Sequence, residues 1–172
     1  MLPFNSTSVA VLVFVTLQRV GELVYARRNE SRLRARGATE HGPEHYWALV
    51  TLHSAWLVGL WLLAPRQPIN LVWLAVFLAL QGLRFWVLAS LKDRWTTRII
   101  VLPGAPLIKT GLYRLMPHPN YAIVAGEIFS LPMTFGLHAY AVLFSLVNAC
   151  VLAIRIRAEN RALRPKGSSL AE

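Results

Sequence analysis

Residues 121–156 read YAIVAGEIFSLPMTFGLHAYAVLFSLVNACVLAIRI, a long apolar run with a proline and a glycine near its middle. Pro132 and Gly136 are residue types that end helices or mark turns. The run therefore predicts a helical hairpin with arms at residues 121–135 and 138–156. The first arm is short for a membrane span, because a helix needs about 20 residues to cross hydrocarbon about 30 Å thick.

Three more apolar runs lie upstream of the hairpin, at residues 9–25, 46–64 and 69–91. No basic residue precedes the first run and no small-x-small cleavage site follows it, so we expect this segment to stay on the protein. Residues 26–36 extend it as a helix that ends at Gly37, a candidate C-cap. The sequence predicts an all-α membrane protein with about five transmembrane helices, the last two a helical hairpin, in a single domain over residues 1–172.

The composition and the placement of the charges agree with this interpretation. The 172-residue chain is 55% hydrophobic and 15% charged, with a mean hydropathy of +0.45, which is too apolar for an ordinary soluble domain. In a soluble protein, a net charge of +10 would indicate nucleic-acid binding. However, most Lys and Arg residues fall in three segments next to the spans, residues 26–45, 90–120 and 154–166. We therefore expect no nucleic-acid partner.

These basic segments predict the orientation in the membrane, because cytoplasmic loops near membrane helices collect Lys and Arg. The N-terminus and the Gly136 turn have no basic residue, and the Pro65 turn has only Arg66. We expect an integral protein of the bacterial cytoplasmic membrane, with the N-terminus outside and the C-terminus cytoplasmic. Anionic lipid headgroups are the expected partners of the basic face. Trp47 and Trp95 fit the aromatic belt at that boundary.

The sequence offers little for a metal site. Its one cysteine, Cys150, excludes an internal disulfide framework and a multi-thiolate site. His41 and His45 are four residues apart with Glu44 nearby, a spacing seen in some metal sites. Because Gly42-Pro43 prevents a shared regular helix, a loop at the membrane surface is the default interpretation. We expect no metal.

Polar residues inside the predicted spans are candidates for function; they are Arg19, Glu22, Gln81, Arg84, Glu127 and Asn148. A charge in hydrocarbon costs a few kcal/mol, so such residues usually face a partner or a wet cavity. Arg19 and Glu22 form either an intramembrane ion pair beside a snorkelling Arg84 or part of a functional site. Glu127 has no partner nearby in the sequence and is the stronger functional candidate. His53 is interpreted as a helix-packing residue.

Two polar motifs flank the hairpin. Residues 109–121 read KTGLYRLMPHPNY, and residues 155–163 read RIRAENRAL. The first motif ends a Pro/Gly-rich segment over residues 95–119, which excludes a long helix and is typical of a binding loop. The second reads as a helix that continues from the last span until Pro165.

In this order, with the hairpin between them, the motifs resemble the isoprenylcysteine carboxyl methyltransferase-like family of integral membrane methyltransferases. The resemblance covers residues 83–163, the expected catalytic core. The matching residues are Gly111, Tyr113, Arg114, His118, Pro119, Tyr121, Arg155, Glu159 and Leu163. Leu112, Pro117 and Asn160 depart from the family's usual Pro, Arg and second Glu. The amino-terminal half is similar to a bacterial branch whose members methylate long-chain alkylpyrones.

The resemblance implies methyl transfer from S-adenosylmethionine to an oxygen of a lipid-like acceptor, a membrane lipid or a prenyl or alkyl small molecule that enters from the membrane. The implied cofactor-binding residues are Tyr113, Arg114, His118, Pro119, Tyr121, Arg155, Glu159 and Asn160. Glu159 and Asn160 suit the ammonium group of the cofactor, and His118, Arg114 or backbone N–H groups suit its carboxylate. Leu107, Ile108, Tyr113 and Tyr121 offer an apolar slot for the adenine.

Glu127 and Arg84 are the candidate catalytic residues on the acceptor side. Methyl transfer is an in-line displacement, so the protein mainly aligns the reacting groups and excludes water. A carboxylate or acidic enol needs no strong base, whereas a less acidic hydroxyl would use Glu127, and Arg84 would hold an anionic acceptor. The alternative is a non-catalytic membrane transport component or assembly subunit. In that case the two motifs form only an ordered interfacial loop packed on a charged tail helix.

Overall fold

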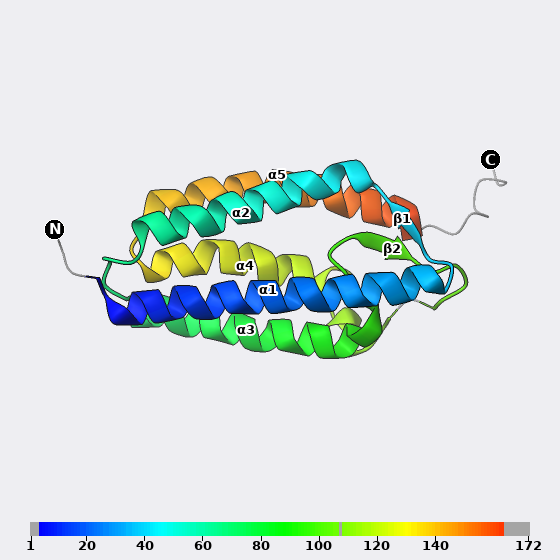
Figure 1. The fold of residues 1–172 in the computed structure, drawn as a ribbon, viewed down its shortest axis with the longest axis horizontal. Helices are drawn as coiled ribbons and strands as arrows, with labels where there is room; N and C mark the ends of the chain where they lie inside the picture. Colours follow the sequence, from blue (N-terminus) through cyan, green and yellow to red (C-terminus); the bar gives the residue numbers. More distant parts are fainter. Residues whose placement is uncertain (1–3, 107, 164–172) are drawn as a thin grey trace.

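The computed structural model describes residues 4–106 and 108–163. Five α-helices run along the long axis of this described part of the chain (Figure 1). They are α1 (Ser6–Ala35), α2 (Tyr46–Leu63), α3 (Leu71–Leu91), α4 (Pro119–Thr134) and α5 (His138–Leu163). The predicted all-α membrane fold and the hairpin formed by its last two helices are confirmed.

Four of these helices have the length and apolar composition of membrane spans. They are α1, α2, α3 with the turn that follows it, and α5, and only 17–22% of their apolar windows is buried. Most of that surface is therefore available to lipid. α4 is different: its 16 residues span about 24 Å, and more than half of them are buried. It lies between the α2–α5 pair and the α1–α3 pair (Figure 1).

Local sequence signals set the helix ends. The Asn5 and Asn70 side chains accept hydrogen bonds from backbone N–H groups and cap α1 and α3. Gly37 and Gly136 follow α1 and α4 with φ of 85° and 69°, values that favour glycine. The first helix ends before Gly37 as predicted, although the C-cap residue itself is Arg36. Pro132 lies in the last turn of α4. Its carbonyl oxygen accepts a hydrogen bond from the backbone N–H of Leu137 at 3.0 Å, which closes the end of the helix.

Apolar side chains fill the part of the bundle near the α2–α3 and α4–α5 turns. The fully buried members of this core are Leu12, Val15, Trp56, Leu60, Ala64, Phe77, Ile128, Leu131 and Phe135. Tyr140 and Phe144 of α5 pack against them. One or two turns further along α1 and α3, the buried side chains become polar, with Glu22 and Arg84 below 10% exposure. The polar residues of the spans therefore start where this core ends.

A two-stranded antiparallel sheet, which the sequence did not predict, joins two connections at the other end of the bundle (Figure 1). β1 (Thr39–His41) pairs with β2 (Ile99–Val101). Arg98 donates to Glu40 at 2.6 Å, and Arg34 also contacts this carboxylate. Although partial burial raises it, these two guanidinium groups hold the pKa of Glu40 below its usual value. The sheet thus fixes the start of the Pro/Gly-rich segment beside the end of α5.

Reporter fusions test the predicted orientation. The ends of α1, α3 and α5 that carry the basic segments lie at the sheet end of the bundle (Figure 1). We expect reporters at Gly37, Gly104 and Ser168, the last outside the described residues, to give a cytoplasmic signal, because Lys and Arg are retained on that side. A reporter in the Gly136 turn should give the opposite signal. A periplasmic signal at Gly104 would contradict the orientation.

Candidate functional site

Two cavities lie between the helices and the loop at the sheet end of the bundle. The larger, about 560 Å³, lies between α5, β2 and the loop; its walls include Leu33, Ile99, Ile108, Tyr113, His118, Glu159 and Asn160. The smaller, about 360 Å³, reaches into the bundle between α1, α2 and α4; its walls include Arg19, Glu22, Tyr46, His53, Trp56 and Arg84. Both volumes fall within the range of small-molecule sites, about 300–1,000 Å³.

The two cavities share part of their walls. Among the described residues, those that line both are Trp95, Thr96, Asn120, Tyr121 and Arg155. Within the described part of the chain, the buried Asn120 Oδ1 and Trp95 Nε1 have no hydrogen-bond partner. Buried polar atoms are normally hydrogen-bonded, so this wall retains bonding capacity for a ligand. A molecule in one cavity would meet the same side chains as a molecule in the other.

Tyr121 is the centre of a polar cluster on this wall. Its hydroxyl donates to the Glu159 carboxylate and accepts from Arg155 Nε at 2.9 Å. Its ring stacks on that of His118, with 5.3 Å between the centroids. His118 in turn lies 3.1 Å from the Asn160 Oδ1 atom. The first turn of α4 and the last turns of α5 therefore meet at one polar surface.

The residues of this surface belong to the two motifs around the hairpin. A model of the isoprenylcysteine carboxyl methyltransferase (ICMT) family matches residues 73–165, which contain both motifs and the hairpin. The chain belongs to this family.

Two similar proteins match this chain over most of its length. It is 41% identical over 160 residues to the uncharacterized protein YpbQ of Bacillus subtilis, covering 90% of this chain and 95% of that protein. It is 28% identical over 170 residues to an uncharacterized protein of Haemophilus influenzae, covering 95% of this chain and 96% of that protein. No solved structure matches the chain.

Membership in the ICMT family makes this protein an integral membrane methyltransferase. The family match covers the region that the motifs indicated, residues 83–163, and extends it at both ends. It accounts for the two motifs that a transport component or an assembly subunit would leave unexplained. The enzyme interpretation is therefore favoured over the non-catalytic one.

Most of the predicted cofactor-binding residues lie in the wall of the larger cavity. They are Tyr113, His118, Tyr121, Arg155, Glu159 and Asn160. Arg114 and Pro119 are not part of this wall. Arg114 ends the 3₁₀ turn Gly111–Arg114 and is exposed, whereas Pro119 is buried as the first residue of α4. Pro119 suits a helix start because its fixed φ is helical and its missing N–H is not needed there.

The predicted apolar slot is present in part. Ile108 and Tyr113 line the larger cavity, and Leu107 lies outside the described residues. Burial, helped by the negative charge of Glu159, raises the pKa of Tyr113 to about 12. The Tyr113 phenol is therefore protonated at neutral pH, so its ring borders the slot as a neutral surface.

The structure shows where one matching residue of the family motif and the three residues that differ from the motif lie. Gly111 has a φ of 58°, and a Cβ at this position would collide with Ser90 Oγ, so this matching position requires glycine. Leu112 packs against a small apolar cluster, Pro117 lines the larger cavity, and Asn160 bonds to the histidine ring. Two of the three departures therefore face the cavity, where they change its charge.

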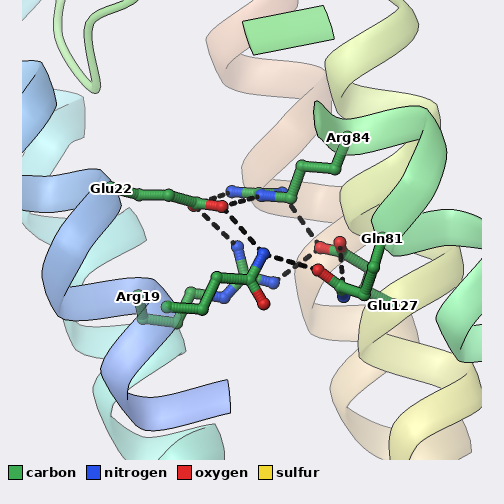
Figure 2. A network of polar contacts seen from close by, with 6 residues as sticks. Arg19, Glu22, Gln81, Arg84 and Glu127 are labelled. Carbon is green, nitrogen blue, oxygen red and sulfur yellow. Dashed lines mark hydrogen bonds and ion pairs between the residues drawn. The ribbon is translucent and has the colours of Figure 1, made fainter. Parts of the chain in front are cut away.

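The charged residues of the spans form one connected network beside the smaller cavity (Figure 2). Glu22 accepts from Arg84 Nε at 2.5 Å and from Arg84 Nη2 at 2.6 Å. One oxygen of Glu127 accepts from Arg84 Nη1 at 2.9 Å and from Arg19 Nη2 at 2.6 Å. Its other oxygen accepts from Gln81 at 2.9 Å. Every nitrogen of Arg84 and both oxygens of Glu127 are thus engaged.

This network shows how the charged residues of the spans are paired. Arg19 and Glu22 are an ion pair, but Arg84 does not snorkel, because its side chain is only 6% exposed and is paired. Glu127 is fully buried and has partners that are far away in the sequence. It lines neither cavity, so a role as base in contact with the acceptor has no support here. Arg84 does line the smaller cavity, and each of its three nitrogens already donates to a carboxylate.

Sequence reasoning missed several residues of the shared wall. Trp95 was interpreted as part of an interfacial belt, yet it is only 4% exposed and lines both cavities. Thr96 and Asn120 were not singled out, although Asn120 stands inside the His-Pro-Asn-Tyr motif that carried the resemblance. Within the described segments, no cluster of three His, Cys, Asp or Glu side chains suits a metal ion.

Proposed function

We propose that this methyltransferase uses S-adenosylmethionine to methylate an oxygen of a lipid-like acceptor that enters from the membrane. The observation that carries the proposal is the wall shared by the larger cavity, at the basic end, and the smaller cavity, inside the helix bundle. The larger cavity lies at the end of the bundle that we expect to be cytoplasmic, where water-soluble cofactors are made. The other is bordered by α1 and α2, whose outer surfaces are apolar.

The donor set of the larger cavity fits S-adenosylmethionine. Glu159 and Asn160 offer a carboxylate and an amide oxygen for the ammonium group. Arg155 has a third nitrogen beyond the two that bond to Tyr121 and Thr97, and this nitrogen suits the cofactor carboxylate. Ile108 and the apolar β2 side chains suit the adenine. When bound, the cofactor supplies a methyl group activated by a sulfonium.

The residues of the shared wall would align the two reactants. Tyr121 is held by its bonds to Glu159 and Arg155, and Trp95 of the same wall is buried. A rigid wall of this kind lowers the entropic cost of the reaction, because the acceptor oxygen is held in line with the methyl group. The same side chains exclude water from the point of transfer.

A ligand-stabilisation assay tests the cofactor assignment. We expect S-adenosylmethionine and S-adenosylhomocysteine to raise the melting temperature of the purified protein in detergent. A ligand at a hundred times its Kd stabilises the folded state by about 2.7 kcal/mol. 5′-Methylthioadenosine, which lacks the amino-acid end, is the matched control and should stabilise less, because it cannot reach Glu159 and Asn160. No shift and no calorimetric heat at millimolar cofactor, with folded protein, would contradict the proposal.

A further inference from the structure

One charged residue of the first motif, Arg114, has no place in the proposed function. It lines neither cavity, and within the described segments its guanidinium makes no hydrogen bond or ion pair. It ends the 3₁₀ turn Gly111–Arg114, and two apolar side chains follow it directly. Leu115 is 78% exposed and Met116 is 45% exposed. One basic and two apolar side chains thus form a continuous exposed segment, residues 114–116.

The turn that leads into this segment lies beside the lipid-facing surface of α3. A Cβ at Gly111 would collide with Ser90 Oγ and would lie 3.2 Å from Trp86 Nε1. Trp86 is 52% exposed, in a helix that is long and apolar enough to span a membrane. Tryptophans of membrane spans gather at the boundary between hydrocarbon and headgroups, and Lys92 follows within two turns of α3. The turn therefore lies near this boundary, beside lipid.

The residues on either side of the segment belong to the wall of the larger cavity. Tyr113 precedes the segment, and Pro117 and His118 follow it. Leu112 packs against the small apolar cluster that contains Trp95 of the shared wall. Side chains that face the protein therefore flank the exposed side chains of residues 114–116. The place of the cavity wall depends on where these exposed side chains are held.

We propose that residues 114–116 are a lipid anchor, in which Leu115 and Met116 enter the acyl chains beside α3. Arg114 pairs with the phosphate of an anionic phospholipid. Moving apolar side chains from water into hydrocarbon is favourable, and a guanidinium group matches the geometry of phosphate oxygens. The anchor holds the adjoining wall of the larger cavity at the membrane surface. The lipid contact is independent of the proposed function, whereas its effect on cofactor binding rests on that function.

The charge at this end of the bundle favours lipid over a second copy of the chain. The last turn of α1, the turn after α3 and the last turn of α5 all carry Lys or Arg. A second copy docked side by side would bring these like charges together, whereas anionic headgroups offset them. We therefore expect the exposed segment to contact lipid and not another copy.

Fluorescence quenching tests the lipid contact directly. A bimane label is attached at Met116→Cys in a Cys150→Ala background, and the protein is reconstituted into phosphatidylglycerol vesicles with brominated acyl chains. We expect strong quenching, because residue 116 lies among these chains. Native Cys150 is the positive control, since it is exposed within α5. A label at Ala35→Cys, in the basic end of α1 and the same background, should be quenched much less. Quenching at residue 116 no stronger than at residue 35 would overturn the anchor.

Titration calorimetry in phosphatidylglycerol nanodiscs tests the effect on the larger cavity. We expect Leu115→Ser/Met116→Ser to bind S-adenosylhomocysteine roughly tenfold more weakly than the wild type, the factor that burial of one large apolar side chain supplies. Leu71→Ser/Val72→Ser is the matched control. It changes two side chains with 74% and 72% exposure at the opposite end of α3, so its affinity should equal that of the wild type. Unchanged affinity in the folded Leu115→Ser/Met116→Ser variant would contradict the effect on the cavity.

Two lipids test the role of Arg114. We expect the wild type to bind S-adenosylhomocysteine roughly fivefold more tightly in phosphatidylglycerol than in phosphatidylcholine nanodiscs, as one basic residue at an anionic surface implies. Arg114→Gln should lose this difference. Arg28→Gln removes the same charge from an exposed position on α1 outside both cavities, and should keep it. Equal lipid dependence in the two variants would contradict the headgroup contact of Arg114.

The anchor and the proposed function can fail separately. If S-adenosylhomocysteine binds to none of these proteins in either lipid, the cofactor assignment is wrong, while the quenching experiment still decides on the anchor. Circular dichroism of each variant, compared with the wild type, shows that it is folded.

Discussion

Glu127→Gln should be the most destabilising conservative change in this protein. The side chain is fully buried and accepts from Arg19, Arg84 and Gln81, so the substitution leaves two guanidinium groups facing one remaining carboxylate, Glu22. Breaking a buried ion pair by removing one partner costs about 3 to 5 kcal/mol. For a domain of this size, that corresponds to a melting temperature lower by roughly 10 °C.

Thermal unfolding in detergent measures this loss, with Asp93→Asn as the matched control. Asp93 also pairs with an arginine, Arg36, but both side chains are more than half exposed, so its loss should cost at most about 1 kcal/mol. The double variant Arg19→Gln/Glu127→Gln should recover part of the stability, because the charges balance again. A Glu127→Gln protein as stable as wild type would mean that the network contributes nothing to folding.

Glu159→Gln should weaken cofactor binding roughly ten- to a hundredfold. In the proposed site the ammonium group loses a charge-assisted partner, which contributes about 1.5 to 3 kcal/mol. The Tyr121 hydroxyl, which donates to Glu159, keeps a neutral acceptor in the variant, so the shared wall should persist. Titration calorimetry with S-adenosylhomocysteine gives the affinity directly.

The Glu127 and Glu159 variants should differ in this titration. Folded Glu127→Gln should bind the cofactor almost as tightly as wild type, because Glu127 does not line the larger cavity. Glu30→Gln removes the same charge outside both cavities and is the matched control for Glu159→Gln. Equal loss in the Glu127 and Glu159 variants would place Glu127 in the cofactor site. No loss in either would make both residues structural.

The helices and their order were predictable because each depends on local sequence. Apolar runs near 20 residues fix a span, and the glycines at 37 and 136 end helices through their own positive φ. The predicted arms 121–135 and 138–156 differ from α4 and α5 mainly at the ends, since α5 continues to Leu163 as the tail motif indicated. The family motif located Tyr121, Arg155 and Glu159, which lie in the site.

The remaining features depend on contacts between distant segments. Glu127 had no visible partner because Arg84 and Arg19 precede it by 43 and 108 residues. The β1–β2 pairing joins two three-residue strands that have no hairpin turn between them, and such short strands give no periodic signal. From the sequence we interpreted His53 as a packing residue. An isolated histidine in an apolar run does not reveal that its side of the helix borders a cavity.

The buried charge network also has a consequence for how the chain enters the bilayer. α1 carries Arg19 and Glu22 three residues apart, so this segment is electrically neutral when it leaves the insertion machinery. α3 carries Arg84 and α4 carries Glu127, so each alone would take an uncompensated charge into hydrocarbon at a cost of a few kcal/mol. We therefore expect α3 to integrate more favourably once α4 has been synthesised, because the charges of Arg84 and Glu127 then offset each other.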